Sequence, residues 1–356
     1  MKTGRFSSLW NHEFLLSGKQ DASNNFARGY HAVGKQMIDK VNDGIRKWAE
    51  KCDDLEGFMV SHSVGGGTGS GLGSLILEQL GENYKKNLST CVIEPYNALL
   101  TTHCLLDNIE MSLVFENEAI YNICKNKLLI AKPDVNHLNS LIAKVISGVN
   151  SSNRGDSFNL NSLCTDLCYA QIHFITTGMA PILPKADITV NVPDDLDIIT
   201  IDCFEPSNWF VQYTEFDPEK EKCTGLRVVH RANVYGRDSS AAFFRCRSKY
   251  SLVDWPPTCR SCTLDQTPIA ILETDDIAKF SKSTVLLANN TGIRTFIKQI
   301  TKQFDYMYSQ KAFVHWYTKE GIEEYELANA REELEFLQKN YFEISSIAND
   351  EYSDND

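Results

Sequence analysis

The first long segment of the chain repeats apolar residues with the period of an amphipathic helix. From about Asn24 to Cys52 they recur every three or four positions and form one face. A short apolar run, Gly57–Ser61, follows, then a glycine-rich loop, and then a second apolar segment that begins at Leu72. The pattern predicts a helix, a buried strand, a loop and another helix.

Helical and strand patterns continue to alternate up to residue 150. A strand is predicted within Thr90–Asn97, ending at Pro95, and helices are predicted within Asn117–Leu128 and Asp134–Asn150. Short apolar strands that exit at glycine or proline, interleaved with helices, are typical of an α/β sheet. We therefore expect an α/β domain in this part of the chain.

The pattern changes after residue 170. Residues 171–274 are rich in strand signals, with strands predicted at Ile172–Thr177, Leu226–Val229 and Ala241–Arg247. Helices are predicted at Gly292–Gln310 and Glu323–Phe342, and the last eight residues, NDEYSDND, are strongly acidic. The fold class expected is an α/β domain, then a mixed α+β domain, then C-terminal helices.

Composition narrows the range of functions. The chain has 356 residues, 42% of them hydrophobic, and a net charge of −12 from 47 acidic and 35 basic residues. This acidic balance argues against nucleic acid as a partner, and no apolar run is long enough to span a bilayer. Eleven cysteines without an apolar signal segment at the start predict reduced cytosolic thiols. Cys259 and Cys262 form a single CxxC pair, which supplies half of a tetrahedral metal site, so we predict no metal centre there.

The segment Gly65–Gly71, GGGTGSG, is the strongest chemical signal. Glycines between a strand and a helix allow backbone N–H groups near a helix N-terminus to approach an anion, and Ser63, Thr68 and Ser70 add hydroxyl donors. The loop lacks the lysine of a P-loop, and no later acidic residue completes a dinucleotide fingerprint. A flexible linker is the alternative, but linkers rarely separate two apolar elements, so phosphate binding is favoured.

Other segments join this loop in a specific resemblance. Together with GGGTGSG they resemble the tubulin family in the same order along nearly the whole chain, and the longer stretch Asp265–Asp276 resembles α-tubulin more than β-tubulin. The segments are Ser17–Asp39, Val92–His103, Glu116–Cys124, Cys203–Phe210, Val253–Thr258, Phe304–Glu324 and Ala330–Tyr341.

The resemblance implies a site for GTP. The residues expected near the phosphates are Ser63, Gly66, Gly67, Thr68 and Gly69, with Ala22, Ser23 and Asn24 close to the terminal phosphate. Thr90 and Glu94 would lie near the ribose, and Asn117 and Asn139 would read guanine, whose edge suits an amide that both donates and accepts. Mg²⁺ would accompany the nucleotide, but its usual acidic partner lies in a family segment that would precede Met1.

The resemblance also implies an organisation. It predicts a partial Rossmann-like GTPase domain over residues 1–134, a central linking helix over 135–154, an intermediate α+β domain over 155–290, a helical hairpin over 291–345 and an acidic tail over 346–356. The partners implied are β-tubulin, motor proteins and microtubule-associated proteins, in the cytoplasm on the microtubule cytoskeleton. The aromatic segment His315–Tyr317 would make longitudinal subunit contacts.

Three departures from the family pattern qualify these expectations. Val135 stands where the family has an aromatic residue that stacks on the base. In α-tubulin a glutamate after the central helix orients the hydrolytic water on the nucleotide of the next β-subunit, but Ser157–Leu167 contains no glutamate and Asp166 is in a different register. The opening strand of the family's first domain, with its glycine-glutamine turn, has no counterpart after Met1, so Gly57–Ser61 would form an unpaired strand edge.

Three functions remain open at this point. The first is an α-tubulin-like structural subunit that binds GTP and pairs with β-tubulin. The second is an active GTPase whose catalytic acid comes from elsewhere, and no catalytic residue is assigned here. The third is a degenerate or truncated paralogue that holds no nucleotide and does not polymerise.

Overall fold

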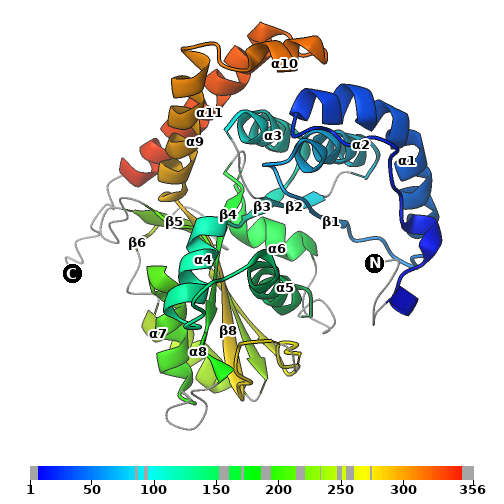
Figure 1. Cartoon of the computed structure of the whole chain (residues 1–356). Coiled ribbons are helices and arrows are strands. Elements are labelled where there is room, and N and C mark those ends of the chain that lie inside the picture. Colours follow the sequence, from blue (N-terminus) through cyan, green and yellow to red (C-terminus); the bar gives the residue numbers. More distant parts are fainter. Residues whose placement is uncertain are drawn as a thin grey trace. The chain divides into compact units, whose positions relative to one another are not determined.

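The computed structural model describes most of the chain, and Figure 1 shows it. The described residues are 7–84, 87–91, 95–151, 160–169, 172–185, 194–213, 221–232, 234–246, 251–253, 260–272 and 275–346. They divide into two compact units, Met1–Ile109 with Gln299–Glu335, and Glu110–Lys298 with Phe336–Asp356.

The first unit begins with two short 3₁₀ helices, η1 (Ser7–Leu9) and η2 (His12–Phe14). The main elements then follow in the order predicted around the glycine loop. They are a π-helix η3 (Arg28–Gly34), α1 (Lys35–Ala49), β1 (Phe58–Ser61), a second π-helix η4 (Thr68–Leu72), α2 (Gly73–Tyr84), β2 (Asn87–Cys91) and α3 (Pro95–Asn108). Strands β1 and β2 are parallel, with Phe58 opposite Asn87 and Ser61 opposite Thr90. In the strand order of the described residues β1 stands at an end, in line with the edge expected for it.

Three helices near the C-terminus complete the described elements of this unit. They are α10 (Val314–Lys319) and the parts of α9 (Ile293–Tyr308) and α11 (Glu324–Ser346) that belong to it. The apolar stripe predicted for the last helix is confirmed, because every member is at most 1% exposed: Leu327, Ala330, Leu334, Leu337 and Tyr341. Arg331 makes a two-point ion pair with Asp305, with Nε–Oδ1 and Nη2–Oδ2 distances of 2.8 Å, and so ties α11 to α9.

The second unit is built on a mixed sheet. Its strand order is β3 (Met111–Val114), β4 (Phe174–Ala180), β8 (Lys282–Asn290), β5 (Lys222–Ala232) and β6 (Ser251–Leu252), and β7 (Arg260–Asp265) also pairs with β5. Strand β8 runs antiparallel to both of its neighbours, whereas β3 is parallel to β4, and β6 and β7 are parallel to β5. The α/β class expected from the sequence is therefore confirmed.

Helices cover both faces of this sheet. Leu226 and Val228 of β5 lie in a buried cluster with residues of α7 (Leu196–Phe204) and α8 (Gly236–Cys246). On the opposite face of β5, Arg227 contacts α6 (Leu160–Leu167) and Arg231 contacts α5 (Val135–Ser151). Figure 1 shows these two helix pairs on either side of the strands, and α4 (Asn117–Asn126) lies near α5.

One predicted strand is wrong. Residues 241–246 of the predicted strand Ala241–Arg247 belong to α8, and Arg247 lies outside the described residues. Ser239, Ala242 and Cys246 are buried at intervals of three and four residues, while Phe244 is 62% exposed. The apolar pair Phe243–Phe244 resembled a buried strand, but a helix buries only one of the two rings in the core.

The structure thus groups the chain differently from the domain boundaries expected from the resemblance, which remain a prediction. Several elements had no explicit sequence prediction, namely α3, α7, α10, β3 and β8. Across the described residues, no helix combines the length and the apolarity needed to cross a bilayer.

Candidate functional site: a glycine loop and its supporting turn

The glycine loop joins β1 to η4 and α2, as the sequence predicts for an anion-binding loop. No glycine between Gly66 and Gly71 has a left-handed φ, so these glycines are not required for unusual backbone torsions. Most are instead required by close packing of backbone against backbone. A Cβ on Gly67 would lie 2.4 Å from the Asn25 nitrogen, and a Cβ on Gly69 would lie 2.1 Å from the Ser63 oxygen.

Gly66 differs from these neighbours. A Cβ built on it would meet nothing within 4 Å, so this part of the loop faces open space. The helix that follows starts directly after it, with Gly67 at the N-cap position of η4. An open backbone at a helix N-terminus is the local geometry that phosphate binding requires.

The hydroxyl groups of the loop differ in their accessibility. Ser63 and Thr68 are exposed, so both remain candidates for contact with a ligand. Ser70 is buried, and its hydroxyl donates a 2.7 Å hydrogen bond to the Gly66 carbonyl oxygen. The prediction that Ser70 is a ligand donor is therefore wrong, because its hydroxyl stabilises the start of the helix instead.

His62 supports the loop through a hydrogen bond to its backbone. The sequence did not predict this role, since only the position of His62 directly after the strand hinted at it. Its Nδ1 lies 2.8 Å from the Gly69 carbonyl oxygen. Burial lowers the pKa of His62, and this hydrogen bond opposes the shift only in part. The ring is thus neutral at pH 7 and donates from Nδ1, which fixes the loop without adding a positive charge.

The Ala22–Asn24 segment forms a tight turn. Ser23 and Asn24 have φ values of 47° and 54°, which are uncommon for residues other than glycine. The carboxylate of Asp21 stabilises the turn by accepting hydrogen bonds from the Ser23 nitrogen at 3.2 Å and the Ser23 Oγ at 3.1 Å. Ala22 is buried, whereas the side chains of Ser23 and Asn24 are exposed.

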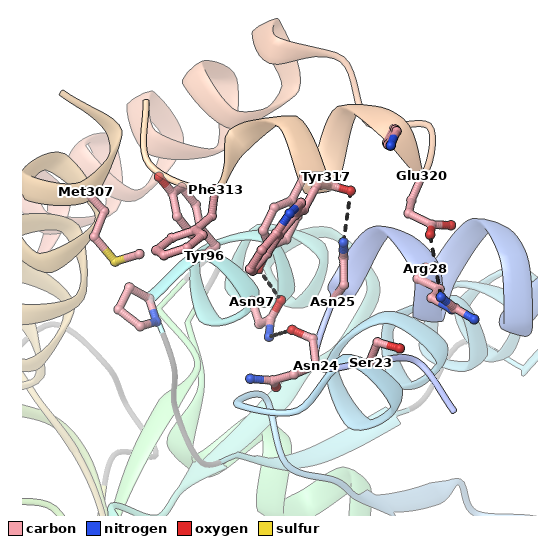
Figure 2. Close-up of a pocket in the computed structure, with 13 residues that line it drawn as sticks. Ser23, Asn24, Asn25, Arg28, Tyr96, Asn97, Met307, Phe313, Tyr317 and Glu320 are labelled. Carbon is pink, nitrogen blue, oxygen red and sulfur yellow. Dashed lines mark hydrogen bonds and ion pairs between the residues drawn. The ribbon is translucent and has the colours of Figure 1, made fainter. Parts of the chain in front are cut away.

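Asn97, on α3, connects this turn to the glycine loop (Figure 2). Its Nδ2 donates to the carbonyl oxygens of Asn24 at 3.1 Å and Gly65 at 2.7 Å. Its Oδ1 accepts from the Phe26 nitrogen at 3.0 Å and the Tyr317 hydroxyl at 2.8 Å. The side chain is only 2% exposed, and sequence reasoning missed it.

A pocket of about 460 Å³ opens beside the turn, within the first unit. Figure 2 shows the turn on one side and the α10 segment on the other. Its floor includes Tyr96 and Asn97, its α10 wall includes Phe313, Trp316 and Tyr317, and Arg28 pairs with Glu320 at 3.8 Å on its rim.

Comparisons with known proteins agree with this geometry. Residues 1–125 match the family model described as Tubulin/FtsZ family, GTPase domain, and residues 170–303 match the Tubulin C-terminal domain. The Saccharomyces cerevisiae tubulin alpha-3 chain is 41% identical over 97% of this chain and 81% of its own length. The chain belongs to the tubulin family.

Two other similar proteins are also named as alpha chains of tubulin. The Eremothecium gossypii tubulin alpha chain is 40% identical over 99% of this chain and 82% of its own length. The Emericella nidulans tubulin alpha-1 chain is 39% identical over 97% and 80%, respectively. The chain is therefore an α-tubulin-like member of the family, and its first domain is of the family's GTPase type.

The remaining residues expected at a tubulin nucleotide site belong to other elements of the chain. Thr90 is the penultimate residue of β2, and Glu94 falls outside the described residues. Asn117 is the first residue of α4 and Asn139 lies in the first turns of α5, and both side chains are exposed. Val135 begins α5 and is 69% exposed. The two asparagines belong to the second unit, so the complete set of nucleotide contacts stays a prediction.

The acid considered for hydrolysis has a structural partner. Asp166 of α6 lies 2.9 Å from the Arg227 guanidinium, whose side chain is only 2% exposed. Burial lowers the pKa of Arg227, and the Asp166 carboxylate opposes that shift. The ion pair between Asp166 and Arg227 thus connects α6 to β5.

No group of three or more metal-ligating side chains is close enough to hold an ion within the described part of the chain. Cys262 is near the Ser239 hydroxyl, with an Oγ–Sγ distance of 3.0 Å, and Cys259 falls outside the described residues.

Proposed function

We propose that this chain is a microtubule subunit that binds GTP at the glycine loop and pairs with a β-tubulin subunit. The observation that carries the proposal is the pairing of an open Gly66 with a loop that is otherwise packed backbone to backbone. A loop preorganised in this way pays little entropy when a phosphate arrives, because its backbone donors are already in position.

We assign the phosphates to the loop and to the turn that Asn97 ties to it. The loop residues are Ser63, Gly66, Gly67, Thr68 and Gly69, and the turn residues are Ala22, Ser23 and Asn24. The left-handed turn is consistent with this role, because strained backbone concentrates at ligand sites.

We assign the nucleoside to four further residues. Asn117 and Asn139 would read guanine through amide donors and acceptors, and their exposure leaves both amides accessible. Thr90 and Glu94 would contact the ribose. Mg²⁺ would bind with the phosphates, and the described residues supply no carboxylate cluster for it, so the nucleotide oxygens and water would provide most of its ligands.

We propose that this chain does not stimulate GTP hydrolysis on the nucleotide of an adjacent β-subunit. In the described part of α6 the carboxylate, Asp166, is engaged by a buried arginine and is not free to orient water. Losing a water-positioning acid lowers a rate by about two to four orders of magnitude. An active GTPase with an acid from elsewhere and a chain that holds no nucleotide are the alternatives.

The direct test is the nucleotide content of the purified full chain with a β-tubulin, released by denaturation and separated by chromatography. We expect about one guanine nucleotide per chain. Asn139→Ala should lower GTP affinity at least about tenfold, whereas Asn136→Ala, an exposed amide on the same helix end, should not. Absence of bound guanine nucleotide in the unaltered protein would favour the degenerate alternative.

A sedimentation assay tests the pairing. The chain should pellet with microtubules assembled from a β-tubulin, and its motor and associated-protein partners should bind those polymers. A chain that stays in the supernatant under conditions in which α-tubulin pellets would contradict the assignment as a microtubule subunit.

A further inference from the structure

Asn97 is placed to transmit changes in α10 to the glycine loop. We propose that it is a positioning residue that couples the α10 aromatic segment to both phosphate-facing segments through Tyr317; this rests on the proposed nucleotide function. The coupling path consists of Tyr317, Asn97 and then the carbonyl groups of Asn24 and Gly65.

The orientation of the Asn97 amide is fully determined by its partners. Its two donated and two accepted hydrogen bonds use the full capacity of a carboxamide. A flipped amide would place its NH₂ group against the Phe26 N–H and its oxygen against the Gly65 carbonyl, and both contacts would be repulsive. The amide therefore has one favourable orientation.

Tyr317 makes this orientation depend on α10. Its hydroxyl is one of the two donors to Asn97 Oδ1, and the preceding residue, Trp316, accepts a 3.0 Å hydrogen bond from Asn25 Nδ2 through its carbonyl oxygen. Two successive residues of one helix thus hold two points next to the strained turn. A displacement of α10 would disturb both hydrogen bonds together.

Another molecule could cause such a displacement, because side chains beside Tyr317 are exposed and accessible to it. Trp316 is 54% exposed and Phe313 is 46% exposed, and both line the pocket next to the turn. Whatever contacts this aromatic wall would therefore alter the support of the phosphate-facing segments. Coupling is reciprocal, so nucleotide occupancy would also alter the affinity of this aromatic wall for a molecule that contacts it.

Tyr317→Phe tests the proposal with the least disturbance, because it removes one hydroxyl and keeps the buried ring. Tyr96→Phe is the matched control. Tyr96 is equally buried and its ring lies 5.2 Å from that of Tyr317, but its hydroxyl donates to the Ala312 carbonyl oxygen, which belongs to neither phosphate-facing segment.

The first readout is hydrogen–deuterium exchange of the peptides covering residues 22–30 and 62–72 in the full chain. Tyr317→Phe should raise exchange in both peptides by about fivefold, the effect of losing one neutral hydrogen bond, while Tyr96→Phe should leave both unchanged. Unchanged exchange in Tyr317→Phe, or an equal increase in both variants, would overturn the coupling.

The second readout is GTP affinity, measured with a fluorescent analogue. Tyr317→Phe should weaken binding by about fivefold while lowering the melting temperature no more than Tyr96→Phe does, and Asn97→Asp, which loses both donated hydrogen bonds, should weaken binding further. If the unaltered protein binds no GTP, the proposed function fails, and the exchange experiment still decides the coupling. If it binds and Tyr317→Phe binds equally well, the coupling fails alone.

Discussion

The glycine loop allows a prediction in which two adjacent glycines have opposite consequences. Substituting Gly67 by alanine would place a Cβ 2.4 Å from the Asn25 nitrogen and 2.8 Å from the Ala22 oxygen. Both atoms belong to the backbone and cannot rotate away, so the loop and the Ala22–Asn24 turn must separate by about 1 Å. Overpacking of this kind costs about 3 kcal/mol of unfolding free energy.

Gly66→Ala should leave the stability of the chain nearly unchanged but weaken GTP binding. Nothing lies within 4 Å of the new Cβ, and the φ of Gly66 is one that alanine adopts, so the unfolding free energy should change by less than about 0.5 kcal/mol. The methyl group would, however, occupy the space that we assign to phosphate. A steric penalty of about 1.4–2.7 kcal/mol corresponds to a 10- to 100-fold loss of GTP affinity.

Two assays separate these outcomes. Chemical denaturation of the full chain gives the unfolding free energy, and titration with a fluorescent GTP analogue gives the affinity. We expect Gly67→Ala mainly to lower the unfolding free energy and Gly66→Ala to lower only the GTP affinity. The reasoning is refuted if Gly66→Ala binds GTP as tightly as the unaltered chain, or if Gly67→Ala is as stable as Gly66→Ala.

Three further predictions concern the second unit. Val135→Tyr on the exposed start of α5 should raise guanosine nucleotide affinity about tenfold by adding a ring that can stack, and a binding titration showing no gain would contradict this. Asp166→Asn should lower the unfolding free energy by about 2–4 kcal/mol, because it removes the carboxylate paired with the buried Arg227, yet GTP turnover with β-tubulin should stay constant. Burial raises the pKa of Asp275, but hydrogen bonds, that of Lys144 first among them, outweigh burial and lower it. The stabilisation from this pair should be fully present above about pH 4 and shrink as the pH falls below it, so the difference in unfolding free energy between Asp275→Asn and the unaltered chain should be larger at pH 5 than at pH 3.5.

The elements that could be predicted from sequence are those with an apolar repeat sustained over many residues or with glycine or proline at their boundaries. Helix α5 was found because its apolar spacing is regular, and strand β1 because a short apolar run lies between glycines; both are where the pattern placed them. The strand predicted at Ala241–Arg247 failed because a pair of adjacent phenylalanines fits either a strand or a helix end. Only the packing of α8 against β7 and α7 decides the matter.

The glycine loop shows a different limit. Its position between a strand and a helix was evident from sequence, and so was its fitness for an anion. The reason for each glycine was not evident, because for Gly67 and Gly71 it depends on residues 22–30, which pack across the loop backbone. Sequence reasoning assigned the same role to Gly66 and Gly67, whereas one faces open space and the other faces the backbone of Asn25.

The proposed nucleotide binding and the stimulation of hydrolysis would depend on separate parts of this chain. Binding would rest on backbone groups of the loop and on a turn that the Asn97 amide holds in place, and neither requires a particular acid. Stimulating hydrolysis on a neighbouring subunit would require a carboxylate that is free to orient water, whereas Asp166 of α6 is paired with Arg227. A subunit that binds GTP without stimulating hydrolysis on its neighbour would have a structural role rather than an enzymatic one.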